Sequence, residues 1–290
     1  MRWLAATIRL RERGEAGVLV TVTAVRGHAP RDAGAKMVVT ATGTWDTIGG
    51  GALEAVAIER SRAMLAAGAS VPETSTSTLS EHVVVGAMEH GAQEHGAQGH
   101  GARNYGVQCC GGEVSVLLEP LGVAPTVAVF GLGHVGHELA RILSRHDLDL
   151  HLVDTRAEQL TPGRLGPIAE GDARIHVHAA PVLPEAVLVT LPAGAHVLVM
   201  THDHAEDAAI VDAALRTPGL GSIGLIGSSA KWTRLRRRLL ADGLSEGDVA
   251  RVTTPIGLPE LTGKDPAVIA VSVAADLLVR LTADRVGSRT

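Results

Sequence analysis

The second half of the chain alternates short hydrophobic runs with amphipathic stretches. This pattern predicts strands near 127–130, 148–153, 174–178, 196–200 and 222–226, and helices near 134–145, 204–216, 229–241 and 266–285. Strands that alternate with helices form a parallel sheet that is covered on both faces. Ligands of such sheets bind at the carboxyl ends of the strands.

Strand-like runs dominate the first half of the chain instead. We predict a short amphipathic helix over 3–13, a helix from 52 to 67, and strands over 16–25, 37–42, 74–80 and 113–119. A linker over 120–125 then marks a domain boundary. The chain is therefore predicted to be an α/β protein, with an N-terminal α+β domain (1–120) followed by a C-terminal Rossmann-like parallel-sheet domain (126–290).

A repeat with a period of five residues, rich in glycine and histidine, covers 86–105. Its apolar content is too low to pack a core, and a period of five matches neither a helix nor a strand. We therefore expect a flexible surface excursion. His90, His95 and His100 could bind a metal, but a tolerated expansion of the repeat in a loop is the favoured interpretation.

The clearest chemical signal is a glycine motif after the first strand of the second half. Gly131, Gly133 and Gly136 have the spacing G-x-G-x-x-G, and Asp154 ends the next predicted strand, 18 positions after Gly136. The three glycines permit a tight turn, close approach of a phosphate, and close packing of helix on strand. The helix that begins at His134 offers free N–H groups to an anion, and Asp154 can accept hydrogen bonds from a ribose. A domain that uses these glycines only for packing is the alternative.

Two further motifs lie in the first half of the chain. Gly49, Gly50 and Gly51 open a predicted helix, which is entropically costly unless their N–H groups face a bound anion; a hinge is the alternative. Cys109 and Cys110 are the only cysteines. Adjacent Cα atoms lie ~3.8 Å apart, closer than the ~4.4–6.8 Å usual for a disulfide, so two thiols or thiolates are expected. Thiolates suit soft metals; a pair of small residues at the start of a strand is the alternative.

Four polar residues follow other predicted strands of the parallel sheet, namely His202, His204, Ser228 and Lys231. His202 and His204 would share one face of a strand, but a zinc site lacks a third ligand of matching spacing. Contact with a polar substrate is favoured over zinc, and capping of a helix by Asp203 is favoured over both. No base stands at a recognisable spacing from Ser228, so no catalytic residue is assigned.

Composition excludes some classes of partner. The net charge of −5 and the 2% aromatic content give no basis for binding nucleic acid. No apolar run reaches the ~18 residues that span a bilayer, and the N-terminus has no apolar signal-peptide core, so a cytoplasmic protein without a membrane anchor is expected.

The glycine and cysteine motifs belong to a longer ordered set. The set comprises LVTVT at 19–23, APR at 29–31, GAKM at 34–37, TIGGG at 47–51 followed by Leu53-Glu54, QCCGG at 108–112, GLGHVG at 131–136, THDH at 201–204 with Asp207, IGLIGS at 223–228 with Lys231, PIGLP at 255–259, GKDPA at 263–267 and SVAA at 272–275. In this order, and from about Val18 to Leu278, the sequence resembles the XdhC/CoxI family of xanthine dehydrogenase accessory proteins. The five-residue repeat before Gln108 departs from the family pattern.

The resemblance implies a carrier and not an enzyme. Members of the family are understood to bind the molybdenum cofactor, a molybdopterin that also occurs in a dinucleotide form. They protect it while a cysteine desulfurase installs its sulfido ligand, and pass it to a molybdenum hydroxylase of the xanthine dehydrogenase type. Carried over to this chain, the glycine motifs and the polar residues at the sheet edge would bind the cofactor, and Cys109 or Cys110 would contact molybdenum. A homodimer is expected.

Two other functions stay open at this point. An oxidoreductase that uses NAD(P) would need the same glycine motif and the same distal acid. A scaffold that only docks the hydroxylase and the desulfurase would need no small molecule. We rank the carrier first, the oxidoreductase second and the scaffold third.

Overall fold

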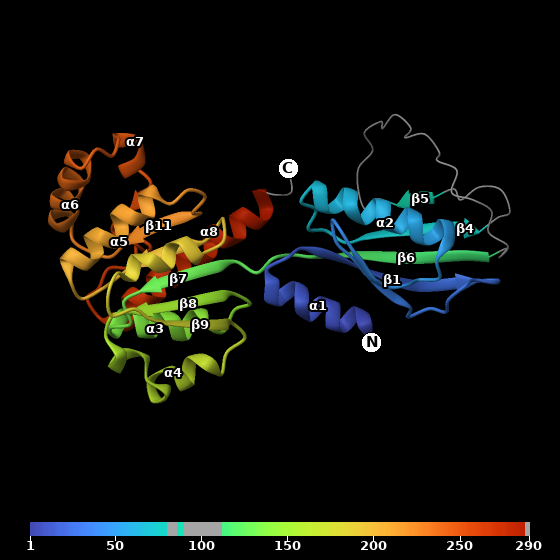
Figure 1. The fold of residues 1–290 in the computed structure, drawn as a ribbon, viewed down its shortest axis with the longest axis horizontal. Coiled ribbons are helices and arrows are strands. Elements are labelled where there is room, and N and C mark those ends of the chain that lie inside the picture. Colours follow the sequence, from blue (N-terminus) through green and yellow to red (C-terminus); the bar gives the residue numbers. More distant parts are fainter. Residues whose placement is uncertain (80–85, 90–111, 288–290) are drawn as a thin grey trace. The chain divides into compact units, whose positions relative to one another are not determined.

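The structure is a computed structural model that describes residues 1–79, 86–89 and 112–287 (Figure 1). The chain divides into two compact units, Met1–Val123 and Ala124–Asp284. The first contains an antiparallel sheet and the second a parallel sheet. The predicted fold class, an α+β domain followed by a Rossmann-like parallel-sheet domain, is confirmed.

The first unit is a six-stranded antiparallel sheet with the order β3-β2-β1-β6-β4-β5. Its strands are β1 (Gly17–Arg26), β2 (Lys36–Val39), β3 (Thr44–Asp46), β4 (Glu73–Leu79), β5 (Gly86–Glu89) and β6 (Gly112–Leu121). The helix α2 (Gly51–Ala66) packs on one face, where Val18, Val20 and Val22 of β1 meet Leu53 and Ala57. The helix α1 (Arg2–Arg13) packs on the other face through Ala6 and Leu10. The period of two along β1 thus sorts side chains between two helices.

Two details of this unit differ from the predictions. β5 pairs with β4 from Ser77↔Gly86 to Thr74↔Glu89, so the first residues of the repeat are an edge strand and not a flexible excursion. Backbone pairing to a free strand edge requires no apolar side chains, which explains why composition missed it. The histidines predicted as a weak metal site lie outside the described residues. In addition, β6 includes Pro120, which pairs with Val18 of β1. The pairing of β6 with β4 stops at Leu118, so no strand on that side needs the N–H that proline lacks.

The second unit is a six-stranded parallel sheet with the order β12-β11-β10-β7-β8-β9. Its strands are β7 (Thr126–Phe130), β8 (Asp149–Asp154), β9 (Arg174–Ala179), β10 (His196–Val199), β11 (Ser222–Leu225) and β12 (Val252–Thr253). Its helices are α3 (His134–Leu143), η1 (Ala157–Leu160), α4 (Pro162–Ala169), η2 (Pro184–Thr190), α5 (His204–Arg216), α6 (Ser229–Ala241), α7 (Glu246–Val249) and α8 (Pro266–Gly287).

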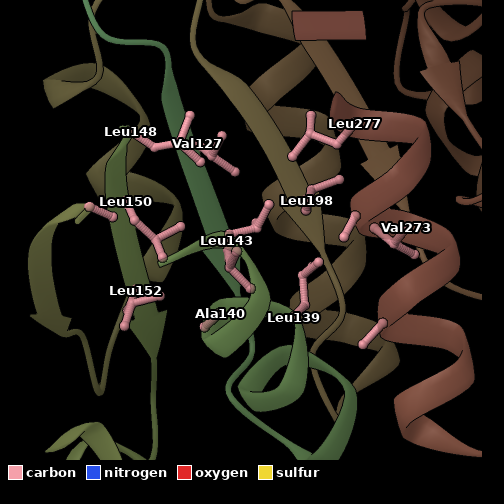
Figure 2. Packing of buried hydrophobic residues seen from close by; sticks show 14 of the residues in the cluster. Val127, Leu139, Ala140, Leu143, Leu148, Leu150, Leu152, Leu198, Val273 and Leu277 are labelled. Atoms are coloured by element: carbon pink, nitrogen blue, oxygen red, sulfur yellow. The ribbon is translucent and has the colours of Figure 1, made fainter. Parts of the chain in front are cut away.

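Each face of the parallel sheet has its own core. Alternate residues of β7, such as Val127 and Val129, face α3 and α8, while Ala128 and Phe130 face α5 and α6. Figure 2 shows the first of these cores, where the leucines of α3 and β8 meet Val127 and the side chains of α8. The apolar runs of β7, β8, β10 and β11 are thus buried on both sides, as in other parallel sheets, whereas the edge strand β9 is partly exposed.

Every strand and helix predicted in the second half is present, with bounds that shift by a few residues. The prediction omitted α4, since Pro162, Gly163, Gly166 and Pro167 conceal its periodicity; burial of Ile168 in the core holds this helix. Across the described residues, none of the helices is both long and apolar enough to cross a membrane.

Candidate ligand site at the carboxyl edge of the parallel sheet

The strand order of the parallel sheet reverses between β7 and β10. At such a reversal the connections on the two sides diverge and leave a crevice at the carboxyl ends of the strands. The glycine motif follows β7 and touches the end of β10, because a Cβ on Gly131 would lie only 2.5 Å from the carbonyl oxygen of Met200. The motif predicted from sequence therefore lies at the reversal point.

The three glycines of the motif have different surroundings. Gly131 is buried with φ 101°, and Gly136 is buried so closely that a Cβ there would lie 1.9 Å from the carbonyl oxygen of Gly131. Gly133 is partly exposed with φ −67°, and a Cβ on it would meet nothing within 4 Å. The surroundings of the first and third glycines agree with their predicted packing roles. The space over Gly133 is open, as the predicted role of the second glycine, close approach of a phosphate to the backbone, requires.

The helix that follows the motif begins without a side-chain cap. Within the described part of the chain, no side chain accepts a hydrogen bond at the N-terminus of α3, where Gly133 is the N-cap residue. By contrast, Asp203 caps α5 by accepting a hydrogen bond from the Ala205 N–H at 2.6 Å, and Ser228 caps α6 by accepting one from the Lys231 N–H at 3.3 Å. The predicted capping role of Asp203 is confirmed. Of these three helices, α3 alone begins with no side-chain acceptor for its N-terminal N–H groups.

Asp154 holds the glycine turn in place. Its carboxylate accepts a hydrogen bond from the Leu132 N–H at 2.6 Å, and others from the N–H and guanidinium of Arg156 at 2.8–3.0 Å. Burial alone would raise the pKa of the Asp154 carboxyl, but the hydrogen bonds from Arg156 and Leu132 outweigh burial and hold the pKa below its usual value. The carboxylate therefore has a structural role, and ribose binding by Asp154 stays a prediction.

A buried network lies behind the exit of β10. The fully buried carboxylate of Asp207 accepts hydrogen bonds from the N–H of Thr201 at 3.0 Å, from its hydroxyl at 2.8 Å, and from the ammonium of Lys231. Lys231 also donates to the carbonyl oxygen of Ile226 at 3.0 Å. A buried carboxylate needs such donors, so this network ties the exits of β10 and β11 together. The ammonium of Lys231, predicted to bind a ligand, is already engaged by protein acceptors.

The two histidines after β10 do not share a face of a strand. His202 lies in the loop and His204 is the first residue of α5, because the strand ends at Val199. The strand geometry considered for a zinc pair is therefore wrong. No group of three or more His, Cys, Asp or Glu side chains within residues 1–79, 86–89 and 112–287 could hold a metal ion. Both histidines are exposed, and their contact with a ligand stays a prediction.

Glu206 is a site residue that sequence reasoning missed. It lies on the first turn of α5 and accepts a hydrogen bond from the Thr155 hydroxyl at 3.3 Å, which bridges the exits of β8 and β10. Burial, aided by the charges of Asp154 and Asp207, raises the pKa of its carboxyl. Acidic residues are common in the first turn of a helix, because the helix dipole favours negative charge there. The sequence therefore contains no sign that Glu206 lies at the crevice, and only the fold shows it.

The glycine loop of the first unit is filled by the protein itself. One carboxylate oxygen of Glu54 accepts hydrogen bonds from the Thr47 hydroxyl, from the Ile48 N–H at 3.1 Å and from the Gly50 N–H at 3.0 Å. The Gly49 N–H donates to the Thr47 hydroxyl at 3.0 Å. The expectation that these two glycines face a bound anion is wrong, because protein acceptors occupy their N–H groups. For Gly51, the prediction stays untested.

Cys109 and Cys110 lie outside the described residues. The described chain resumes at Gly112, where a Cβ would lie 2.2 Å from the carbonyl oxygen of His28. The loop after β1 also reaches the glycine loop, since a Cβ on Gly49 would lie 2.8 Å from the ring of Pro30. The start of β6 and the loop 49–51 therefore both pack against the loop that follows β1.

Comparison with known proteins decides the family. The model of the XdhC Rossmann domain matches residues 127–277, more than half of the chain, and the model of the XdhC and CoxI family matches residues 10–76. The chain belongs to the XdhC and CoxI family. The first match includes the entire glycine motif, and the second includes the loop held by Glu54.

Two individual proteins are similar to this XdhC family member. The uncharacterized protein YqeB of Escherichia coli (strain K12) is 27% identical over 169 residues, which are 58% of this chain. The chain spans only 30% of the length of that curated relative. A crystal structure described as a xanthine dehydrogenase from Bacillus halodurans has a TM-score of 0.44 and 19% sequence identity, over 98% of this chain and 96% of that one.

Proposed function

We propose that this protein is a carrier of the molybdenum cofactor, which binds by its phosphate or diphosphate at the glycine motif. The observation that carries the proposal is the open space over Gly133 at the point where the strand order reverses. A phosphate there would meet the backbone directly, because no side chain of the described residues comes within 4 Å of a Cβ placed on Gly133. The uncapped N-terminus of α3 supplies N–H donors and a partial positive charge.

Membership of an accessory family favours a carrier over an enzyme. A carrier must release its cargo intact, and hydrogen bonds from backbone N–H groups hold a phosphate without any covalent step. His134 at the start of α3 and Glu206 on the first turn of α5 both lie at this edge of the sheet, and we expect them to contact such a cargo. In the dinucleotide form of the cofactor, the ribose would lie toward Asp154, at the end of β8.

The test is the small molecule that copurifies with the protein from a host that makes molybdopterin. Gly133→Ala adds one methyl group to the open space and leaves internal contacts intact, so we expect it to fold and to lose the bound pterin about tenfold or more, or about 1.4 kcal/mol. Gly166→Ala is the matched control, since Gly166 also faces open space but lies in α4. Pterin fluorescence after oxidation, together with mass spectrometry, gives the readout.

Four outcomes would count against the carrier. Parent protein that contains no pterin, or Gly133→Ala protein that retains as much pterin as the parent, would contradict the proposal. NADH fluorescence that is enhanced with saturation at micromolar concentration, and lost in Gly133→Ala, would favour an oxidoreductase that uses NAD(P). Capture of the partner enzymes without any small molecule would favour a scaffold.

The cysteine pair has a separate role in this proposal. Cys109 or Cys110 contacts the molybdenum of the bound cofactor and guards its oxidation state, because thiolates are soft ligands. A Cys109→Ala/Cys110→Ala variant should therefore lose bound molybdopterin relative to the parent. Equal retention by the two proteins would refute the thiol role and leave the glycine motif untouched.

The partners follow from the same role. The carrier hands its cargo to a molybdenum hydroxylase of the xanthine dehydrogenase type, and a cysteine desulfurase installs the sulfido ligand while the cofactor is bound. Affinity capture with the loaded protein should retain both enzymes, and capture with the Gly133→Ala protein should retain less hydroxylase. Light scattering tests the proposed homodimer, which a monomeric mass would exclude.

A further inference from the structure

A cavity of about 410 Å³ lies between α5 and α6, at the carboxyl end of β11. This volume is in the range of small-molecule sites. The cavity is separate from the glycine motif, none of whose residues lines it. Its lining consists of His204, Ala208, Ile226, Gly227, Ser228, Lys231, Arg234, Leu235 and Arg238.

The cavity carries positive charge and no acidic side chain in its lining. Lys231 contributes little net charge, because its ammonium is paired with the buried Asp207. Arg234 has no carboxylate partner among the described residues. Arg238 lies 3.5 Å from the carboxylate of Asp242, with both side chains more than half exposed, so water competes with this pair. Two guanidinium groups are thus available to an anion.

The rest of the wall is apolar. Ala208 of α5, Ile226 after β11 and Leu235 of α6 line the interior of the cavity. Gly227 lies beside the aliphatic part of Lys231, where a Cβ would come within 2.6 Å of its Cδ, so a larger residue would displace this side chain. An apolar wall next to two arginines suits a ligand that has both a ring or chain and an anionic group.

The arginines of α6 lie on different faces of the helix, and only some of them line the cavity. Arg234 and Arg238 are four residues apart and line the cavity, together with Lys231 and Leu235 on the same face. Arg236 is paired with Glu246 of α7, and Arg237 is exposed outside the lining. One helix therefore supplies both the candidate ligands of an anion and a matched arginine that lies away from the cavity.

We propose that this cavity binds a phosphorylated organic ligand of mononucleotide size. Arg234 and Arg238 hold the phosphate, and Ala208, Ile226 and Leu235 contact the apolar body. The ligand is either a free mononucleotide or one half of a dinucleotide that reaches across the strand reversal to the glycine motif. The second source rests on the proposed function, whereas the first does not.

Calorimetric titration of the full chain with AMP, CMP, GMP and inorganic phosphate tests the site. We expect at least one mononucleotide to bind with a Kd below about 1 mM, and to bind at least about tenfold more weakly to Arg234→Ala/Arg238→Ala. Arg237→Ala should bind like the parent. Because the three arginines are exposed, all variants should keep the parent's Tm.

Three results would overturn the proposal. These are no binding of any mononucleotide, equal binding by the parent and the double variant, and binding of inorganic phosphate as tight as that of the nucleotides. The last result would show that the apolar wall contributes nothing.

Diadenosine diphosphate distinguishes the two sources. Binding at least about tenfold tighter than AMP, with the gain lost in Gly133→Ala, identifies the site as one half of a dinucleotide site. Equal affinity for the two probes identifies a separate mononucleotide site. Gly133→Ala protein that loses copurified pterin but keeps its affinity for the mononucleotide would show that the two proposals succeed or fail independently.

Discussion

The two glycine-rich loops of this protein look alike in sequence and differ in what they face. Each follows a strand, opens a helix and was predicted to bind an anion through backbone N–H groups. In the first unit the carboxylate of Glu54 occupies the loop 47–50. In the second unit Asp154 accepts a hydrogen bond from the Leu132 N–H of the loop, and the space over Gly133 stays open.

The difference shows that a glycine-rich loop is open to a ligand only where no carboxylate of the protein already accepts its N–H groups. Glu54 is carried by the helix that the loop itself opens, so its carboxylate is delivered in every folded molecule. Asp154 comes from the neighbouring strand and approaches from the side of the sheet. The first loop therefore has its N–H groups occupied by the helix it opens, whereas the helix after the second loop begins without a side-chain acceptor.

The largest effect should come from Gly136→Ala. Its new methyl group would overlap the carbonyl oxygen of Gly131, so the helix and the turn must separate. We expect the second unit to lose about 3 kcal/mol of its free energy of unfolding, the upper end of the usual range for overpacked cores, because the methyl group would meet backbone and not a movable side chain. Urea denaturation, followed by the fluorescence of Trp232 in a Trp3→Phe/Trp45→Phe background, measures this loss. A loss below about 1 kcal/mol would contradict the close packing.

Glu54→Ala should have the next largest effect, on the first unit. Three donors would lose their acceptor, at a cost of about 2–3 kcal/mol. The matched variant Glu54→Gln keeps an acceptor oxygen and should cost less. Because the emptied loop becomes an anion site, added formate should raise the Tm of Glu54→Ala and leave that of the parent unchanged. An equal response of both proteins would contradict the self-filled loop.

Acid should lower the free energy of unfolding of the second unit, whose parallel sheet supports the second loop. Burial, together with the charges of His176 and His178, lowers the pKa of His151 in β8 from 6.5 to about 4. The unfolded state therefore binds more protons between these values, and stability is lost as the pH falls from about 6.5 to about 4. We expect a loss of about 1–2 kcal/mol after discounting for the partial exposure of the ring.

The control for this pH dependence is His151→Leu, which should flatten the stability of the second unit between pH 6.5 and 4. The depressed pKa of Asp154 acts in the same direction at lower pH, since its contribution is lost as the pH falls through the folded value, below 3.8. A parent protein whose second unit is equally stable at pH 6.5 and pH 4.5 would contradict the assignment to His151.

Gly133→Ala should change the free energy of unfolding least, by about 0.5 kcal/mol or less, because the added methyl group meets no neighbour. This result would separate the second glycine from the third by several kcal/mol within one motif. Thermal unfolding of both variants under the same conditions measures the difference. Similar losses in the two variants would show that the turn has no open side.

The sequence by itself determined the elements and their order. Hydrophobic period is a local property, so β7, β8, β10 and β11 and the helices between them could be predicted from their own residues. The position of the glycine motif at the sheet edge followed from the same alternation. Where local signals conflict, as in α4 with its prolines and glycines, prediction failed, since that helix is stabilised by packing of Ile168 and Leu165 against the core.

Only the tertiary structure decided which backbone donors are free. The Leu132 N–H meets a carboxylate 22 positions away, and Lys231 meets one 24 positions away, so the chain must fold before either pairing exists. The cavity between α5 and α6 depends likewise on two helices that the sequence separates. Local patterns specify which segments form, whereas the ligand that a loop can accept depends on what other segments bring to it.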